Sequence, residues 1–169
     1  MVEMEVLTVQ LDSAVNSPVV VLREVAGQSR LLPILIGQPE AVAINWALEG
    51  TPTPRPMTHD LLQDVIEDLG AHLQRVVITH MHQGIFYADL VISTESGERI
   101  VSGRPSDAIA LALRVRCSIH VDDNVLEIAG VRPDETGEAP DEVEGGEDVV
   151  EQFREFIDSI NPDDFNPAG

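Results

Sequence analysis

The segment after Arg104 constrains the fold more than any other part of the chain. It predicts a helix that begins near Pro105 and is apolar on nearly all sides, built from Ala108, Ile109, Ala110, Leu111, Ala112, Leu113 and Val115. A helix without a polar face is buried on most of its sides. We therefore expect the other elements of the chain to pack around this helix.

Strands are predicted on both sides of this helix. Residues 4–11 alternate between apolar and polar side chains, and residues 19–25 and 31–36 are β-branched or aliphatic runs. Near the end of this part of the chain, residues 119–121 and 125–128 predict two short strands.

Two further helices are predicted in the first half of the chain. The first follows Gly37, has Pro39 near its start, and ends before Gly50. The second has Thr58 as its N-cap and ends at Gly70. Its apolar residues recur at helical spacing and predict a buried stripe, which consists of Leu61, Leu62, Val65, Ile66 and Leu69.

A two-residue hairpin turn is predicted at Gln83-Gly84, with a strand on each side. The order of elements mixes hairpins with helices, which is typical of an α+β fold. We expect a compact single domain over residues 1–133, with a largely antiparallel or mixed sheet and about three packed helices.

Acidic residues are concentrated at the C-terminal end. The chain has 169 residues, 30 acids and 10 basic residues, all Arg, and a net charge of −20. Residues 1–133 have a net charge of −8 and residues 134–169 one of −12. We expect residues 134–148 to be an acidic disordered linker and residues 149–161 a short amphipathic helix within the acidic tail, which docks on the body or on a partner.

Composition excludes several classes of protein. A chain without Lys and with this acidic balance has no basic patch for nonspecific binding of nucleic acid or of acidic membranes. Its longest uninterrupted apolar run, residues 108–113, is far too short to span a membrane. The acids Glu3 and Glu5 do not fit a signal peptide, and the lone Cys117 excludes an internal disulfide. We therefore expect a cytoplasmic protein with no membrane partner.

Three predicted helices share an acid in their first turn: Glu40, Asp60 and Asp107. Acids at helix starts complement the helix dipole and stabilise it by ~0.3–1 kcal/mol each, which alone explains their positions. The alternative is that the three helix starts converge and form one polar site. The same dipoles disfavour a metal ion there unless the carboxylates reach away from the helix axes.

Basic side chains lie beside the same helix starts. Arg55, His59 and Arg104 flank them, and helix N-termini together with Arg form phosphate sites in many proteins. For Arg104 the simpler interpretation is an ion pair with Asp107 that fixes the helix start. For His59 it is an exposed residue at the start of its helix.

The hairpin predicts a second cluster of polar residues. A two-residue turn pairs His82 with Ile85, His80 with Tyr87 and Ile78 with Asp89. His80, His82 and Asp89 then share a sheet face and could bind Zn²⁺ or Mn²⁺. The favoured interpretation is that these polar side chains simply face water, because the sequence does not establish a third metal ligand.

Known sequence signatures of cofactor sites and catalytic nucleophiles do not occur in the chain. It has no glycine-rich phosphate loop, no GxSxG nucleophile elbow, no HExxH motif and no zinc-finger spacing of cysteines. We therefore expect no organic cofactor.

Five sequence strings together resemble the bifunctional nuclease family. They are Leu32-Pro33-Ile34, Ile36-Gly37-x-x-Glu40-Ala41, Arg55-Pro56-x-Thr58-His59-Asp60-Leu61-Leu62, Phe86-Tyr87-Ala88 and the most specific one, Arg104-Pro105-Ser106-Asp107 with the apolar helix up to Arg114. The resemblance covers residues 1–133. It implies a compact α+β fold, self-association into a homo-oligomer, and cleavage of both DNA and RNA.

The match places Glu40, His59, Asp60, Arg104 and Asp107 in the shared motifs, without identifying which of them are catalytic. The family pattern often has an acid just before the Arg-Pro-Ser-Asp string, whereas here Ser102 and Gly103 precede it. His80 and His82 are not part of the pattern, which weakens the case for a metal site on the hairpin.

Two functions follow as hypotheses. As a nuclease, the chain would hold one or two Mg²⁺ or Mn²⁺ ions on Glu40, Asp60 and Asp107, with His59 moving a proton and Arg55 or Arg104 binding phosphate. Because the chain is acidic, we expect nucleic acid to bind weakly and in a salt-sensitive way. The alternative is a non-catalytic regulatory module that binds a small anion or nucleotide at the helix starts and a basic protein through its acidic tail.

Overall fold

A mixed sheet of seven strands forms the frame of the protein in the computed structural model, which describes residues 1–13 and 15–132. The strand order is β3-β2-β1-β7-β4-β5-β6, and β4 and β7 are parallel whereas the other neighbours are antiparallel. The strands are β1 (Val2–Asp12), β2 (Ser17–Glu24), β3 (Leu31–Leu35), β4 (His72–His82), β5 (Ile85–Thr94), β6 (Gly97–Gly103) and β7 (Ser118–Val121). The expected α+β class is confirmed.

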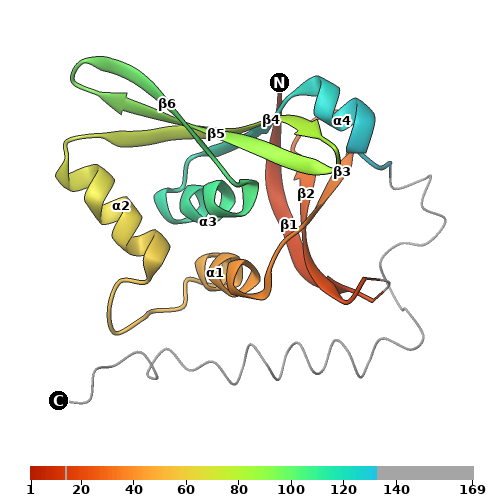
Figure 1. Cartoon of the computed structure of the whole chain (residues 1–169), viewed down its shortest axis with the longest axis horizontal. Coiled ribbons are helices and arrows are strands. Elements are labelled where there is room, and N and C mark those ends of the chain that lie inside the picture. The colour runs from red at the N-terminus through yellow and green to blue at the C-terminus, as the bar shows by residue number, and fades with distance from the viewer. Residues whose placement is uncertain (14, 133–169) are drawn as a thin grey trace.

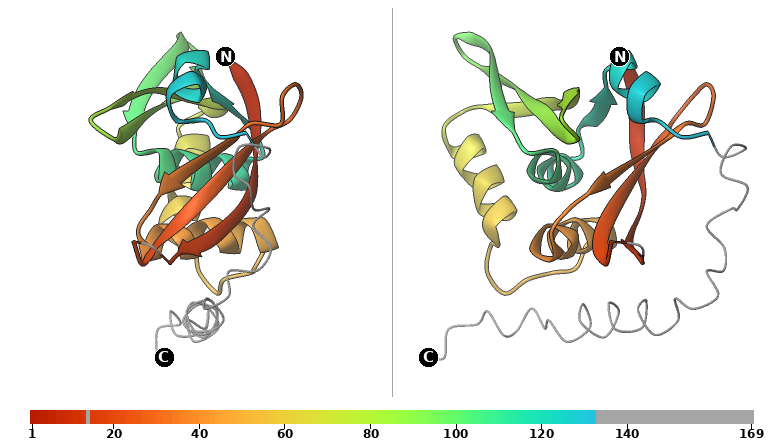
Figure 2. Two further views of the ribbon diagram at one scale, coloured as in Figure 1. Left: turned by 90° about the vertical axis from the view of Figure 1, so that its right-hand side faces the viewer. Right: turned by 45° about the vertical axis from the view of Figure 1, so that its right-hand side comes forward.

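Four helices pack on this frame. They are α1 (Gln38–Glu49), α2 (Thr58–Asp68), α3 (Pro105–Val115) and α4 (Asp123–Ala129). The strands β1–β3 run across the direction of β4–β6, and α1 and α3 lie side by side in the angle between the two sets (Figures 1 and 2). In Figure 1, α2 stands at one side of this pair and α4 lies beyond the sheet near the N-terminus.

Helix α3 is the centre of the core, as its sequence predicts. Its residues from Ala108 to Ala112 are each at most 1% exposed. They pack with aliphatic side chains from α1, α4 and the sheet, including Leu22, Leu32, Ile44, Val76, Ile78, Val121 and Leu126. No helix among the described residues is long and apolar enough to cross a membrane.

The predicted buried stripe of α2 is wrong. Leu61, Leu62, Val65 and Leu69 are 40–79% exposed, and only Ile66 of the stripe packs against the core. The inward side of α2 carries His59, Asp60, Gln63 and Ile66 instead. Periodicity shows that the helix has an apolar and a polar face, but the neighbouring elements decide which face is buried. Here the neighbours of α2 are polar groups of α3, so the polar face lies inside.

The start of α2 and the end of the described chain also differ from the predictions. The N-cap of α2 is Met57 rather than Thr58, because the Asp60 carboxylate accepts a hydrogen bond from the Met57 N–H at 2.9 Å. Residues 125–128 form part of helix α4, not a strand. Asp122 caps this helix by accepting from the Asn124 N–H at 3.0 Å, which stabilises the first turn.

The hairpin forms at Gln83-Gly84 as predicted, with His82 opposite Ile85 and His80 opposite Tyr87. The third predicted pair is wrong, because a bulge in β4 between Ile78 and His80 shifts the register and places Asp89 opposite Val77. The predicted linker 134–148 and helix 149–161 lie outside the described residues.

Candidate active site

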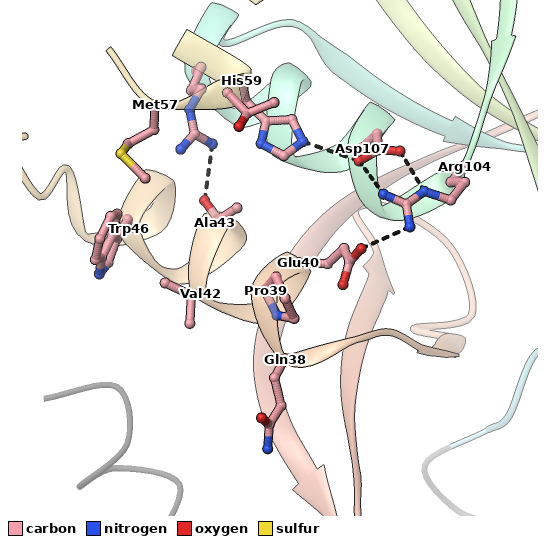
Figure 3. A pocket seen from close by; sticks show the side chains of 12 residues that line it. Gln38, Pro39, Glu40, Val42, Ala43, Trp46, Met57, His59, Arg104 and Asp107 are labelled. Atoms are coloured by element: carbon pink, nitrogen blue, oxygen red, sulfur yellow. Dashed lines mark hydrogen bonds and ion pairs between the residues drawn. The ribbon is translucent and has the colours of Figure 1, made fainter. Parts of the chain in front are cut away.

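The starts of α1, α2 and α3 meet at one pocket of about 420 Å³, which we call the helix-start pocket. Their N-caps are Gly37, Met57 and Arg104. Figure 3 shows that side chains from all three helices point toward this hollow. The lining residues are Gln38, Pro39, Glu40, Val42, Ala43, Trp46, Met57, Thr58, His59, Arg104, Asp107 and Arg114.

Arg104 connects two of the predicted acids. Its Nε and Nη2 donate to the two carboxylate oxygens of Asp107 at 2.7 and 2.9 Å, and its Nη1 donates to Glu40 Oε1 at 2.8 Å (Figure 3). Hydrogen bonds from Arg104 to Asp107, and then to Glu40, raise the pKa of the guanidinium. The Arg104 side chain is still 65% exposed, so part of its donor set faces solvent.

His59 joins this cluster from α2. Its Nε2 lies 3.3 Å from Asp107 Oδ1, and its side chain is 11% exposed. An ionised carboxylate can only accept, so Nε2 carries a hydrogen, and in the neutral ring the lone pair is then on Nδ1. His59 is therefore buried, not an exposed helix-start residue.

The environment of Asp107 keeps it ionised. Partial burial raises its pKa, but the hydrogen bonds from Arg104 and His59 outweigh burial, so the pKa of Asp107 lies below its usual value. An ionised Asp107 fixes the ring orientation of His59. A histidine oriented by a carboxylate is the arrangement found in many proton-transfer sites.

Asp60 lies next to the pocket but does not line it. Its carboxylate forms an ion pair with Arg114 Nε and accepts from the Met57 N–H, so both oxygens are engaged. Arg114 also donates to the carbonyls of Ala43 and Ala110, at 3.0 and 2.9 Å. The pair joins α2 to α1 and α3, and it holds His59 in place through the backbone.

Arg114 is a charged residue of the pocket that the sequence prediction did not assign to the site. Its side chain is only 9% exposed. A signal was present in the sequence, because Arg114 ends an otherwise apolar, buried helix, and a buried Arg needs an acidic partner. What the sequence does not specify is which acid, since Asp60 lies 54 positions away.

Arg55 does not belong to the site as described. It is exposed in the loop before α2 and is not among the residues that line the helix-start pocket. Of the six residues predicted at the helix starts, four therefore meet in one pocket: Glu40, His59, Arg104 and Asp107.

The backbone of Gly37 makes room for Glu40. A Cβ at this position would lie 2.2 Å from Glu40 Oε2. The carboxylate of Glu40 therefore folds back over the start of its own helix, where it reaches Arg104.

The carboxylates predicted to hold a metal ion are paired with Arg side chains instead. Arg104 lies between the carboxylates of Glu40 and Asp107, and Asp60 faces Arg114. Within residues 1–13 and 15–132 there is no group of three or more His, Cys, Asp or Glu side chains that could hold a metal ion. As arranged, the donor set of the pocket does not fit a resident divalent ion, because one would have to displace Arg104.

The predicted metal site on the hairpin, formed by His80, His82 and Asp89, also differs from the expected arrangement. The His80 ring stacks on Tyr87 with a centroid distance of 4.4 Å, and its Nδ1 lies 2.9 Å from Thr79 Oγ1. The bulge in β4 moves Asp89 one position farther from His80. Zinc or manganese binding by His80, His82 and Asp89 stays a prediction.

Cys117 is not part of the pocket. Partial burial raises the pKa of its thiol to about 11, so the thiol is neutral near pH 7. A neutral thiol is a poor nucleophile, which agrees with a structural role.

Comparison with known proteins supports the resemblance. The family described as the bifunctional nuclease domain matches residues 20–134. An uncharacterized protein of Mycobacterium tuberculosis is 46% identical over 164 residues, which cover 96% of this chain and 97% of that protein. Bifunctional nuclease 2 of Oryza sativa subsp. japonica is 30% identical over 119 residues, 68% of this chain and 36% of the plant protein.

The plant match extends to a second species. Bifunctional nuclease 1 of Arabidopsis thaliana is 28% identical over 123 residues, 71% of this chain and 38% of the plant protein. The chain thus corresponds to little more than a third of each plant protein. The four predicted site residues that line the helix-start pocket, Glu40, His59, Arg104 and Asp107, lie within the matched range 20–134. The chain therefore belongs to the bifunctional nuclease domain family.

Proposed function

We propose that this protein is a nuclease that hydrolyses phosphodiester bonds of DNA or RNA in the helix-start pocket. The observation that carries the proposal is the chain of contacts from His59 to Asp107 to Arg104, inside a pocket formed by three helix starts. It combines a group for proton transfer with a cation for phosphate, and the family name and the plant relatives agree with this chemistry.

In this mechanism Arg104 binds the scissile phosphate with the N–H groups that Glu40 and Asp107 leave unused. His59 Nδ1 accepts a proton from water, the water oxygen forms a bond to phosphorus, and the bond from phosphorus to the leaving oxygen breaks. The proton then passes from His59 to the leaving oxygen. Asp107 orients His59 and stabilises its charged form, and general acid–base catalysis of this kind contributes about 10²–10⁴-fold in rate.

No step is assigned to a metal ion, because Arg104 occupies the space between the two carboxylates. Dependence on Mg²⁺ or Mn²⁺ stays a prediction. It requires Arg104 to swing out and release Glu40 and Asp107, and the 65% exposure of Arg104 leaves room for such a movement.

The test is cleavage of single-stranded DNA and RNA by highly purified protein, with and without EDTA, beside the variants Asp107→Asn and Glu40→Gln. We expect Asp107→Asn to lower the rate by about 10²-fold, since Asn cannot stabilise a charged His59. Unchanged activity in both variants would identify the activity as a contaminant. Loss of activity in EDTA that added Mn²⁺ restores would establish the metal.

A second function remains as the alternative, that of a non-catalytic module that binds a small anion or nucleotide. The observation in its favour is charge: a chain of net charge −20 repels a nucleic-acid polyanion more strongly than it repels a small anion that carries few charges. The same assay separates the two functions. Nucleotide binding at Arg104 without any turnover would favour the module.

The predicted partners follow from the proposal. Nucleic acid would bind weakly and in a salt-sensitive way, because the acidic chain repels a polyanion. Self-association would use the exposed stripe of α2, formed by Leu61, Leu62, Val65 and Leu69, since soluble monomers seldom expose a contiguous apolar patch without function. A cytoplasmic location and a basic partner for the acidic tail stay predictions.

A further inference from the structure

A second hollow lies on the other side of the ion pair between Arg104 and Glu40. Its volume is about 460 Å³, and it shares only these two residues with the helix-start pocket. The pair seen in Figure 3 is therefore the partition between two neighbouring cavities. His59 lines the first cavity and not the second.

The walls of this second hollow are mainly apolar. Val15, Leu35 and Ile85 line it and are 53%, 60% and 60% exposed, and Phe86 lies half-buried beside them. These side chains come from three places in the chain: the turn before β2, the end of β3 and the tip of the β4–β5 hairpin. Exposed apolar side chains that converge on a concave surface beside a cation are typical of a ligand site.

The shared Arg104 indicates which ligand fits. A phosphodiester held by Arg104 carries a nucleoside on each of its two ester oxygens. If one nucleoside enters the helix-start pocket, the other is directed across the partition. Each cavity lies in the lower part of the ~300–1,000 Å³ range of small-ligand sites. Such a size suits one nucleoside in each.

Charge favours recognition through bases over recognition through a long phosphate backbone. The chain has 30 acids, 10 Arg and no Lys, and five Arg side chains of the described part form ion pairs. A basic groove that follows many phosphates cannot be built from such a surface. Apolar contact with the face of a base depends little on charge, so it can supply affinity here.

We propose that the second hollow is a nucleoside subsite, in which Leu35 and Ile85 contact the base on one side of the phosphodiester held by Arg104. This inference rests on the proposed function. It makes the smallest well-bound substrate a dinucleotide. Both of its bases must be unpaired, because a base that is stacked and paired in a duplex cannot enter the hollow.

The experiment uses the full-length protein and thymidylyl-(3′→5′)-thymidine, with inorganic phosphate as the comparison ligand. Methyl NMR signals of Leu35 and Ile85 report on the second hollow, and those of Ile100 report on a remote strand. We expect the dinucleotide to shift the signals of Leu35 and Ile85 and leave Ile100 unchanged. Inorganic phosphate should leave all three unchanged.

Neutral variants test the affinity without altering charge. Ile85→Ser should weaken dinucleotide binding by about tenfold, the effect of losing one aliphatic contact. The matched control is Ile100→Ser, since Ile100 is 64% exposed on β6 and does not line the hollow; its affinity should stay within about twofold of wild type.

The outcomes separate this inference from the proposed function. Shifts confined to the helix-start pocket, with Ile85→Ser binding as well as wild type, would overturn the subsite and leave the nuclease proposal standing. Shifts of Leu35 and Ile85 without any hydrolysis would support the subsite and contradict the nuclease proposal. Absence of dinucleotide binding would overturn the subsite.

Discussion

At the scale of single residues, Arg104 organises the site because it is the only cation between two carboxylates in the helix-start pocket as described. It holds Asp107 with two hydrogen bonds and Glu40 with one. The Asp107 contacts fix the start of α3, while the Glu40 contact crosses to α1. A change that frees Glu40 therefore alters the guanidinium position and leaves the start of α3 intact.

Gly37→Ala tests this division of roles. The backbone of Gly37 has φ −81° and ψ 164°, which Ala adopts without strain, but the new Cβ would displace the Glu40 carboxylate. We expect a stability loss of at most about 1 kcal/mol and a fall in activity similar to that of Glu40→Gln. The measurement is a double-mutant cycle of the two changes.

The double-mutant cycle shows whether the two substitutions act through the same contact. If both substitutions act by freeing Arg104 from Glu40, the double variant loses no more activity than either single one. Additive losses would show that Gly37 influences activity by a route other than the contact between Glu40 and Arg104.

At the scale of elements, helix α2 is the most informative, because its polar side faces the protein. His59 and Asp60 face partners on α3, and the apolar stripe faces outward. A helix placed in this way delivers a histidine to the pocket and leaves an apolar surface for another contact.

The exposed stripe predicts self-association. We expect wild type to sediment above the 18.4 kDa of a single chain, and the double substitution Leu61→Glu with Val65→Glu to sediment as a monomer with the fold intact. Ile128→Glu on α4 is the matched control, since Ile128 is 68% exposed and lies outside the stripe. A wild type that is monomeric at every concentration would contradict the prediction.

A second informative feature is the ion pair between Glu24, the buried last residue of β2, and Arg30, which is partly buried in the loop between β2 and β3. Glu24 accepts hydrogen bonds from the Arg30 side chain at 3.0 and 3.1 Å and from the backbone N–H groups of Gln28 and Arg30. The Arg30 hydrogen bond outweighs burial and lowers the pKa of Glu24 below its usual 4.5.

Glu24→Gln should therefore cost stability in a pH-dependent way. A carboxyl whose pKa is lowered by folding stabilises the fold when the pH is above the pKa that the group has in the unfolded chain. This contribution disappears as the pH falls through the pKa that it has in the folded protein. Near pH 7 we expect a loss of about 2 kcal/mol, since Arg30 loses its charged hydrogen-bond acceptor. The difference from wild type should shrink as the pH falls below 4.5.

Denaturant unfolding between neutral and acidic pH measures this effect. The matched control is Glu5→Gln, because the pair of Glu5 and Arg23 is about half exposed and should contribute less than about 1 kcal/mol. An equal loss from both substitutions, or a loss from Glu24→Gln that does not vary with pH, would contradict the assignment.

At the scale of the whole molecule, the sequence predicts those features of the fold that depend on residues close to one another in the chain. The apolar helix α3, the end of α1 at Gly50 and the turn at Gln83-Gly84 agree with the structure because each depends on residues close in sequence. The inward side of α2 and the bulge near Thr79 do not follow from nearby residues. The first depends on the partners that Arg114 and Asp107 offer, and the second on pairing with β5.

The same limit applies to the site. The acids at helix starts are visible in the sequence, but the choice of Arg114 for Asp60, and of Arg104 for Glu40, is made by packing across 54 and 64 positions. Spacing along the chain could therefore indicate a common hollow without indicating which carboxylates face it.

The measurement that tests the central claim most directly is cleavage of a single-stranded oligonucleotide by His59→Gln beside His82→Gln. Both remove an imidazole, but His59 is buried against Asp107 while His82 is exposed at the hairpin tip. We expect His59→Gln to lose about 10²-fold or more in rate and His82→Gln to match wild type. Full activity in a correctly folded His59→Gln would contradict the account.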